Sequence, residues 1–559
     1  MRIAAPARVG LLPRLLYLLP AAFLALFFFY PLGAIFWRSA TLDGRAALAS
    51  YASLWQEPYF ARALWFTSWQ AALSTILTLL VGMPGAYVLA HYSLPGKRLL
   101  FALTTVPFVL PVVVVAAAFT ALLGPRGWLN GTLMTVFALD RPPLQLHQTI
   151  WMILAAHVFY NAAVVIRVVG NFWAGIDPKL GEAARLLGAS RPRAFREVTL
   201  PLLAPAIWAA GMLVFLFCFT SFGVIMILGG PRFATIEVEI YRQAINLFRL
   251  PVAAAMSLAQ MLLTLLLMSA YTRFQARVSY PIGFRPAEEA ARRISSARQA
   301  FLVGLVIAST LGFVLLPMAS LAARSLAPQD SWLYYRELVV NRTSSIFYVP
   351  PAVAIRNSLV FALATMLLAV SMGTATARLL ARSSGRLARI LEPLALLPLG
   401  TSAVTLGFGF ILAMGRPPFD LRASPVLVPI AHSLVAFPFV VRTILPALRG
   451  LNPGWSESAL LLGATPWQVL REVELPIVGR ALLVSAIFSF TISMGEFGAT
   501  LLIARPEYPT MPLVIYRLLG QPGALNYGQA MAMSTILMLV CAVSFVVIER
   551  FRGGGLGEF

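Results

Sequence analysis

Charge is scarce in this sequence. Only 11% of its 559 residues are charged, whereas 59% are hydrophobic and the mean hydropathy is +0.82. Soluble domains carry about 25% charged residues. Runs such as Phe101–Leu123 and Met531–Ile548 contain no charged residue, and a helix needs roughly 20 apolar residues to cross the hydrocarbon core of a membrane. The composition therefore excludes an ordinary soluble domain and predicts an all-α integral membrane protein.

Cysteine and histidine are rare as well. The two cysteines, Cys218 and Cys541, lie inside apolar runs, which excludes a disulfide framework. Two of the four histidines, His157 and His432, occupy corresponding places in the two halves of the chain. Paired positions of this kind are more typical of shared packing than of metal ligation, so we predict no metal site.

The sequence also lacks the motifs of an ATPase or another enzyme. It contains no Gly-x-x-x-x-Gly-Lys-Ser/Thr loop, and its only Gly-Lys pair, Gly96-Lys97, is followed by Arg98. No polar stretch is long enough for a nucleotide-binding domain, and no nucleophile–base set stands out. We therefore predict that the chain is not an enzyme and binds no cofactor itself.

The apolar runs predict about twelve transmembrane helices. They lie near 12–36, 63–91, 100–123, 148–170, 203–228, 251–273, 299–323, 353–380, 388–414, 424–447, 478–503 and 526–550. The first run follows three arginines, as in a signal peptide, but it is too long for one and no small-residue cleavage site follows it. An even number of helices places both termini on one side of the membrane.

Positive charge predicts which side that is. A net charge of +22 would suggest a nucleic-acid partner for a soluble protein, but here most basic residues lie between apolar runs. They concentrate in the loops on one side of the twelve-helix arrangement, which identifies that side as cytoplasmic. Arg232, Arg242 and Arg249 lie on the opposite side, so the bias is partial. We predict a multi-pass protein of the bacterial cytoplasmic (inner) membrane, with both termini cytoplasmic and no nucleic-acid partner.

The two halves of the sequence are repeats. An offset of 275 residues relates His157 to His432, Glu182 to Glu457, Phe222 to Phe497 and Tyr241 to Tyr516. Upstream the offset is 291, as for Gly82 and Gly373, so the first half has about 16 additional residues near 124–148. Six helices in each half give both repeats the same orientation, a parallel repeat with a path at the interface between halves. We predict repeats over 1–280 and 299–559, joined by a cytoplasmic linker over 281–298.

One motif occurs once in each half. Glu182-Ala183-Ala184 is followed by Gly188 and Leu200-Pro201, and Glu457-Ser458-Ala459 is followed with the same spacing by Gly463 and Leu475-Pro476. Asp177-Pro178 and Asn452-Pro453 supply a polar cap and a proline for the first turn of a short helix, and each glycine permits a tight turn. We expect a second short helix that ends before each Leu-Pro. Residues near 177–201 and 452–476 would then form two helix-turn-helix loops.

This spacing resembles the EAA loop of ABC importer permeases, the binding-protein-dependent, type I class. The departures are mild: Ser458 replaces the first alanine of its copy, and Val198 and Val473 replace the usual isoleucine. The resemblance implies a permease with both halves fused, which docks on an ATPase dimer at the cytoplasmic face. It implies coupling roles for Glu182, Ala183, Ala184, Gly188, Glu457, Ala459 and Gly463.

The same resemblance implies how the chain would work. A separate ATPase subunit would hold ATP and Mg²⁺, and an extracytoplasmic substrate-binding protein would deliver the solute. Closure of the ATPase dimer would move the loops, and the two halves would rock about the path between them by alternating access.

The substrate is suggested by two further stretches. One runs from Thr220-Ser221-Phe222-Gly223 to Tyr241, and the other is Met494-Gly495-Glu496-Phe497-Gly498-Ala499. They resemble the corresponding stretches of thiamine permeases, and fused ferric-iron permeases share parts of them. The resemblance implies a small cationic solute, with thiamine favoured and ferric iron as the alternative.

Glu496 is the most unusual residue of these stretches. We expect it inside the eleventh helix, where a carboxylate is costly and faces either an interior cavity or a structural partner. We place Glu496, Ser221, Phe222 and Phe497 on the predicted substrate path. Glu237 and Glu239 are expected in the outer loop between the fifth and sixth helices, where a solvated position is favoured over contact with a cation or a binding protein.

An ion-driven secondary transporter with two six-helix halves is the second functional class. Such a protein needs charged relays embedded in several membrane helices. The sequence shows few candidates besides Glu496, so the ABC importer remains the preferred interpretation.

Overall fold

The computed structural model describes residues 11–40, 58–278, 293–341, 349–383, 385–415 and 420–551, which form helices and no strand. The predicted linker lies outside the described residues up to residue 292. The first half contains α1 (Leu11–Leu24), η1 (Ala25–Phe29), α2 (Tyr30–Ala40), α4 (Pro58–His91), α5 (Lys97–Val109), α6 (Val112–Leu123), α7 (Trp128–Phe137), α8 (Ile150–Ala174), α9 (Pro178–Leu186), α10 (Arg191–Ala194), η2 (Phe195–Thr199), α11 (Leu200–Phe219), α12 (Gly223–Leu228), α13 (Ile236–Tyr241), η3 (Arg242–Asn246) and α14 (Leu250–Val278).

The second half follows the same order with fewer elements before its fourth membrane helix. It contains α15 (Ala297–Arg324), α16 (Leu333–Arg336), α17 (Pro351–Arg382), α18 (Gly385–Leu396), η4 (Leu397–Gly400), α19 (Ala403–Ala413), α20 (Leu427–Arg449), α21 (Pro453–Leu461), α22 (Pro466–Gln468), η5 (Val469–Glu474), α23 (Leu475–Gly495), α24 (Gly498–Ile503), α25 (Met511–Gly520) and α26 (Ala524–Phe551). Helix α7 occupies the additional residues of the first half.

The described residues contain eleven helical segments that are long and apolar enough to cross a membrane. The number is twelve if Leu391–Gly400 and Ala403–Ala413, which meet at a bend of 99°, count as one broken span. The fold class and the expected number of spans are therefore confirmed.

Four of the predicted helices are broken rather than continuous. The run 100–123 divides into α5 and α6 at Leu110-Pro111, and the run 388–414 bends after Pro398, since proline lacks the N–H donor that a helix interior needs. The runs 203–228 and 478–503 stop at Phe219 and Gly495, before the short helices α12 and α24. The expectation that Glu496 lies inside the eleventh helix is therefore wrong: it lies in the turn before α24.

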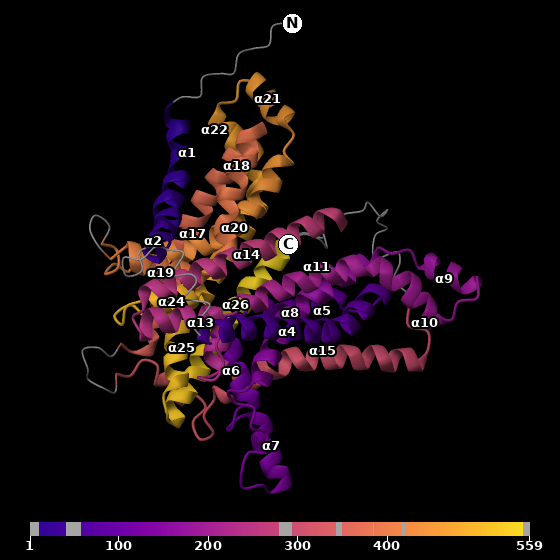
Figure 1. Cartoon of the computed structure of the whole chain (residues 1–559). Coiled ribbons are helices and arrows are strands. Elements are labelled where there is room, and N and C mark those ends of the chain that lie inside the picture. The colour runs from indigo at the N-terminus through magenta and orange to yellow at the C-terminus, as the bar shows by residue number, and fades with distance from the viewer. Residues whose placement is uncertain are drawn as a thin grey trace.

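The helices form two arms that diverge from a common base (Figure 1). One arm contains α4, α5, α8 and α11, and ends at α9 and α10. The other contains α17, α18, α20 and α23, and ends at α21 and α22. The base joins α6, α12 and α13 of the first half to α19, α24 and α25 of the second. Because α13 packs against α19 and α25 against α6, the halves meet through equivalent elements.

The first helix of each half is exchanged between the arms. Helices α1 and α2 pack against α17 and α19 of the second half, and α15 packs against α4, α5 and α6 of the first half. Each arm is therefore completed by a helix from the other half. This exchange ties the halves together while their far ends remain apart.

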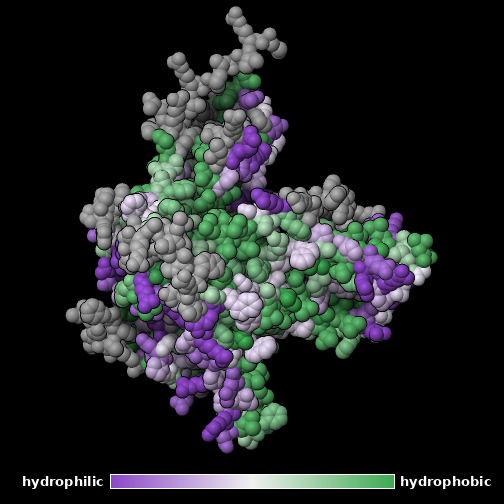
Figure 2. All heavy atoms as spheres, in the orientation of Figure 1, coloured by the Kyte–Doolittle hydropathy of each residue, from purple (hydrophilic) through white to green (hydrophobic). Residues whose placement is uncertain are grey.

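The outer surface of the arms is apolar, as a lipid-facing surface must be. Figure 2 shows green, hydrophobic residues along the arm of α4, α8, α11 and α15, with purple, hydrophilic residues at its end. Trp65, Trp208 and Phe301 are large side chains that are more than half exposed there. Lipid rather than water suits this surface.

Close helix packing inside each arm depends on one glycine. A Cβ at Gly82 of α4 would lie 2.8 Å from the Val165 side chain of α8, and one at the equivalent Gly373 of α17 would lie 2.5 Å from Val440 of α20. Small residues of this kind let membrane helices approach closely.

We expect Gly82→Val and Gly373→Val each to lower the free energy of unfolding by about 1–3 kcal/mol, because the added atoms overpack the contact. The measurement is thermal unfolding of the detergent-purified protein. Gly304→Val and Gly312→Val in α15 are matched controls, since nothing lies within 4 Å of a Cβ at either position. Equal shifts in all four variants would contradict this account of the packing.

Candidate functional site

Four aromatic rings meet where the halves join at the base. The ring centroids of Phe222 and Phe497 lie 5.9 Å apart with 26° between the ring planes. Tyr241 lies 5.9 Å from Phe222, and Tyr516 lies 5.3 Å from Phe497. The two phenylalanines are 275 residues apart in the sequence, and so are the two tyrosines. Equivalent residues of the two halves therefore meet in this cluster. We call these four residues the axial ring cluster.

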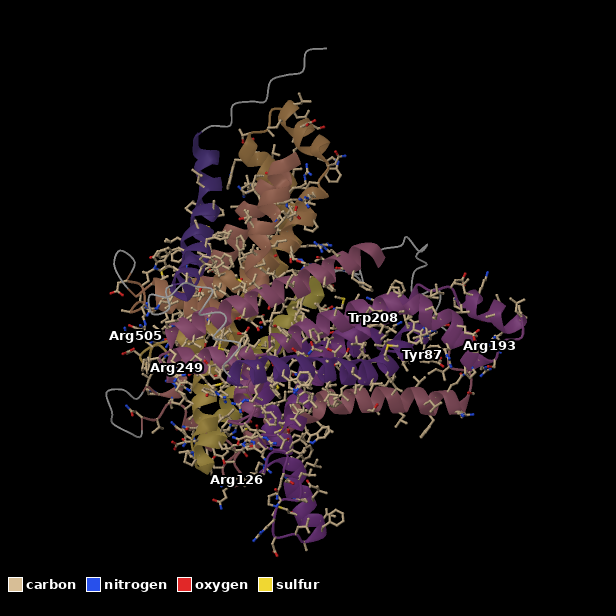
Figure 3. All side chains as sticks on the ribbon, in the orientation of Figure 1. Tyr87, Arg126, Arg193, Trp208, Arg249 and Arg505 are labelled. Atoms are coloured by element: carbon tan, nitrogen blue, oxygen red, sulfur yellow. The ribbon has the colours of Figure 1, made fainter. Side chains whose placement is uncertain are left out.

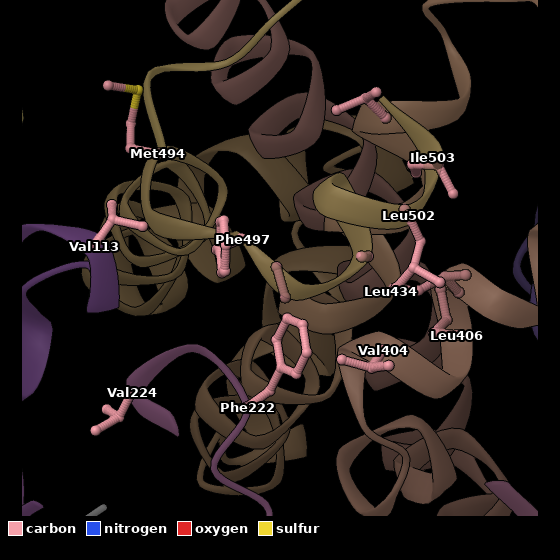
Figure 4. Packing of buried hydrophobic residues seen from close by; sticks show 14 of the residues in the cluster. Val113, Phe222, Val224, Val404, Leu406, Leu434, Met494, Phe497, Leu502 and Ile503 are labelled. Atoms are coloured by element: carbon pink, nitrogen blue, oxygen red, sulfur yellow. The ribbon is translucent and has the colours of Figure 1, made fainter. Parts of the chain in front are cut away.

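The axial ring cluster is buried in the base. Phe222 is 7% exposed and Phe497 2% exposed, and Figure 4 shows both between segments drawn from the two halves. A Cβ at Gly223 would lie 2.5 Å from Val112 and 3.3 Å from the Phe497 ring. Only glycine fits between these neighbours without displacing them. The predicted path residues Phe222 and Phe497 are therefore in contact, although 275 positions separate them.

A buried histidine holds the turn before each phenylalanine. His157 of α8 contacts Ser74 Oγ of α4 and Ser221 Oγ, both at 2.9 Å, through its two ring nitrogens. His432 of α20 contacts Ser493 Oγ at 2.7 Å and Thr500 Oγ1 at 2.8 Å, which are not the residues equivalent to Ser74 and Ser221. Ser221 and Phe222 are neighbours in the chain, so His157 fixes the backbone that carries the ring.

The described residues contain no group of three or more His, Cys, Asp and Glu side chains placed to hold a metal ion. The two histidines lie instead in corresponding hydrogen-bond networks, one in each half. They are positioning residues for the axial ring cluster.

Glu496 is turned into its own half. Its carboxylate accepts hydrogen bonds from the backbone N–H groups of Ala499 at 2.8 Å and Thr500 at 3.0 Å, and from Thr500 Oγ1 at 2.7 Å. His432 Nε2 lies 3.3 Å from it. Glu496 therefore caps the first turn of α24, and its oxygens are occupied by protein donors. Of the predicted path residues, Phe222 and Phe497 meet in the ring cluster, whereas Ser221 and Glu496 lie in the networks behind it.

The expectation of a solvated loop around Glu237 and Glu239 is wrong. Glu237 is fully buried and its Oε2 accepts a hydrogen bond from Ser402 Oγ of the other half at 2.8 Å. Glu239 accepts one from Gln243 Nε2 at 2.7 Å and lies 3.8 Å from Arg242. Helix α13 lies against α19 and α14, a contact between halves that periodicity within one segment does not reveal.

The two motif loops form short helices at the ends of the arms, far from the base (Figure 1). Asp177 accepts a hydrogen bond from Lys179 N at 3.0 Å at the start of α9, and Asn452 from Gly454 N at 2.9 Å at the start of α21. Gly188 and Gly463 have φ of +92° and +90°. Only glycine adopts this left-handed conformation readily, so the predicted caps and turns are both present.

The prediction that a second short helix ends before each Leu-Pro is wrong. The helical segment that starts at Arg191 continues through η2 into α11 without ending before Leu200-Pro201, and η5 likewise continues into α23. Pro201 and Pro476 each follow a π-helical turn, η2 or η5, an irregular turn at which a helix can pass a residue that lacks the N–H donor. Each loop thus continues as one helix into a membrane helix that runs to the base.

Two leucine pairs are nearly bare at the tips of these loops. Leu186 and Leu187 are each 89% exposed, and the equivalent Leu461 and Leu462 are 88% and 89% exposed. Glu182 and Glu457 lie one helical turn before the leucines and are also exposed. One such exposed leucine pair lies at the end of each arm.

A family model described as the binding-protein-dependent transport system inner membrane component matches the chain twice, over residues 82–280 and 366–552. The chain belongs to this family. Each match contains one complete motif loop and one phenylalanine of the axial ring cluster. The protein is therefore an ABC importer permease, a multi-pass protein of the inner membrane.

Relatives extend over nearly the whole permease. The thiamine transport system permease protein ThiP of Escherichia coli is 27% identical over 545 residues, covering 95% of this chain and 94% of the relative. ThiP of Brucella suis is 27% identical over 505 residues, covering 88% of each. A probable ABC transporter permease protein of Sinorhizobium fredii, y4fN, is 27% identical over 516 residues, covering 89% of this chain and 88% of the relative.

One solved structure that aligns with the permease is a bacterial ABC transporter involved in import of the acidic polysaccharide alginate. It shares 20% identity with a TM-score of 0.40, and covers 48% of this permease and 96% of its own chain.

The sequence did not point to Tyr241, Tyr516 or the four bare leucines as functional. The signal for the tyrosines was present, because the 275-residue offset that relates Phe222 to Phe497 also relates the tyrosines. For the leucines the signal was a Leu-Leu pair before each motif glycine, and their exposure distinguishes them from lipid-facing leucines.

Proposed function

We propose that this permease imports a small organic cation, thiamine, into the cytoplasm by alternating access. The proposal rests mainly on one observation. In each half, one continuous helix connects an exposed motif loop at its first end to a phenylalanine of the axial ring cluster at its other end. The relatives named as thiamine transport permeases, which align with up to 95% of the chain, support the choice of solute.

The bare loops would dock on an ATPase subunit dimer, one subunit on each arm. Leu186 and Leu187 in one loop, and Leu461 and Leu462 in the other, provide the apolar anchors, and Glu182 and Glu457 provide the charge beside them. A short helix laid into a hydrophobic groove is a common mode of such recognition. ATP and Mg²⁺ would be held by that partner, and an extracytoplasmic substrate-binding protein would dock at the base.

Coupling follows from the continuous helical connection between loop and base. Helices α11 and α23 run without a break from the docking loops to the turns that carry Phe222 and Phe497. When ATP closes the ATPase dimer, the arm ends approach each other and the rings separate. The path then opens outward and closes inward, which is the rocking of two repeats about a fixed site.

The arginines set the proposed orientation. Figure 3 shows Arg193 at the end of one arm, whereas Arg126, Arg249 and Arg505 lie around the base. The predicted cytoplasmic loops carry the denser group, including Arg185, Arg191, Arg193 and Arg196. We place the arm ends and both termini in the cytoplasm.

The test is uptake by liposomes that contain the permease, its ATPase and its binding protein. We expect uptake of labelled thiamine that requires ATP and persists when an uncoupler removes ion gradients. If the liposomes take up ferric iron and not thiamine, the protein is an ABC importer permease for ferric iron, the alternative substrate. Uptake that survives without ATP but stops with the uncoupler would establish a secondary transporter and contradict the proposal.

A further inference from the structure

We propose that the axial ring cluster is a binding site for the charged ring of an organic cation, with Glu237 as its counter-charge. On opening, the substrate ring would enter between Phe222 and Phe497, with Tyr241 and Tyr516 at its sides. This inference rests on the proposed function and names the residues that recognise the solute during passage.

The geometry of the rings suits such a ligand. Two rings from opposite halves stack at 5.9 Å between centroids, and each is flanked by a tyrosine of its own half. A planar ring held between two others needs about 7 Å, because carbon atoms in contact lie about 3.5 Å apart. The two rings are in contact in this structure, so they would have to separate by about 3.5 Å, the thickness of one ring, to admit the ligand.

The faces of aromatic rings carry negative potential, and they bind cations whose charge is poorly hydrated. Quaternary ammonium groups are recognised in this way by cages of aromatic side chains. A hard metal ion takes oxygen ligands instead, and the four rings supply only two hydroxyl groups. The four rings therefore suit an organic cation better than a metal ion, and the Arg517 guanidinium near Tyr241 is the fixed positive charge that such a ligand would have to avoid.

Glu237 adds a second, independent observation. It lies four residues before Tyr241, on the same face of α13. Its Oε1 atom is buried and makes no hydrogen bond of normal geometry among the described residues, and the side chain of Gln260, whose amide atoms are likewise unpaired, lies beside the carboxylate. A buried carboxylate with a free oxygen is costly unless something positive reaches it.

The free oxygen distinguishes Glu237 from the other two buried glutamates near the base. Glu496 is occupied by Ala499, Thr500 and His432, and Glu239 by Gln243 and Arg242. In the closed state Ser402 of the other half holds Glu237 Oε2. Separation of the halves breaks that bond and leaves the carboxylate for the cation.

The test replaces Phe222 or Phe497 with phenylalanines that carry one, two or three fluorines. Fluorine withdraws charge from the ring face and changes ring size little. The readout is thiamine uptake per ATP hydrolysed, at limiting thiamine, by liposomes that contain the complete importer. Phe219 is the control, because it stacks on Phe215 with 5.8 Å between ring centroids and 28° between ring planes, and it belongs to a different buried cluster from Phe222 and Phe497.

We expect uptake to fall stepwise with fluorine number at Phe222 and at Phe497, by about tenfold for three fluorines, and by less than about twofold at Phe219. Glu237→Gln is expected to lower uptake by about tenfold, whereas Glu239→Gln leaves it within about twofold.

A flat response at Phe222 and Phe497, or an equal response at Phe219, overturns the ring site while the natural chain still imports thiamine. If the natural chain imports no thiamine, the proposed function fails and the ring site fails with it.

Discussion

Replacing Glu182 and Glu457 together with arginine is expected to reduce ATP-dependent uptake to background, by about a hundredfold or more. The two carboxylates lie beside the bare leucines of the two docking loops, and reversing a charge inside a protein interface costs about 2–5 kcal/mol. Because each arm carries one loop, each single variant should retain partial assembly. The measurements are copurification with the ATPase and uptake by liposomes.

The control for that double variant reverses two acidic residues elsewhere. Asp140 and Glu507 are exposed and lie outside the docking loops, so Asp140→Arg with Glu507→Arg makes the same change in net charge. It should leave copurification with the ATPase unchanged. Normal assembly and uptake in the Glu182→Arg, Glu457→Arg variant would mean that these loops are ordinary amphipathic loops.

Glu496→Leu is expected to destabilise the permease by about 3–5 kcal/mol. The change removes the acceptor for two backbone N–H groups of α24 and for Thr500, and leaves His432 with one partner fewer. Each buried donor left without an acceptor costs about 1–3 kcal/mol. Thermal unfolding in detergent measures the effect, and Glu496→Gln, which keeps one carbonyl oxygen, should lose less.

Ser221 offers the matched control, because it occupies the position equivalent to Glu496 in the first half. It makes one hydrogen bond to His157, so Ser221→Ala should cost about 1 kcal/mol. Suppose that the Glu496→Leu protein unfolds at the same temperature as the natural protein but no longer prefers cations. That result would show that Glu496 contacts the solute. The capping role would then be wrong.

The docking loops could be predicted from the sequence because their chemistry is local. A polar cap, a proline and a glycine at fixed spacing specify a short helix and a left-handed turn, and Asp177, Gly188 and their equivalents adopt these roles. The number of membrane spans was predictable for the same reason, since span length depends only on a run of apolar residues.

The base could not be predicted in the same way. The apolar runs continue through the turns at Ser221 and Glu496, so hydropathy does not show that the helices break there. In the first half the turn is held by a histidine from a neighbouring helix, and in the second half the Glu496 carboxylate also caps the short helix that follows it in the chain. Glu237 was assigned to solvent because its partner, Ser402, lies in the other half.

The offset of 275 residues identifies equivalent residues in the two halves, but it does not show which of them are in contact. It related the two phenylalanines and the two tyrosines, but a repeat does not state whether equivalent residues meet or stand apart. The exchange of α1 and α15 between arms and the crossing of α13 to α19 decide that they meet. Such contacts between halves are properties of the assembled fold.

Native mass spectrometry of the purified importer tests the central claim most directly. A chain that carries both halves and both docking loops should form a complex of one permease with two ATPase subunits. Loss of either leucine pair, through Leu186→Ser with Leu187→Ser or through Leu461→Ser with Leu462→Ser, should leave one permease with one ATPase. Two permease chains in the complex, or a permease that retains both ATPase subunits after both pairs are replaced, would contradict the account.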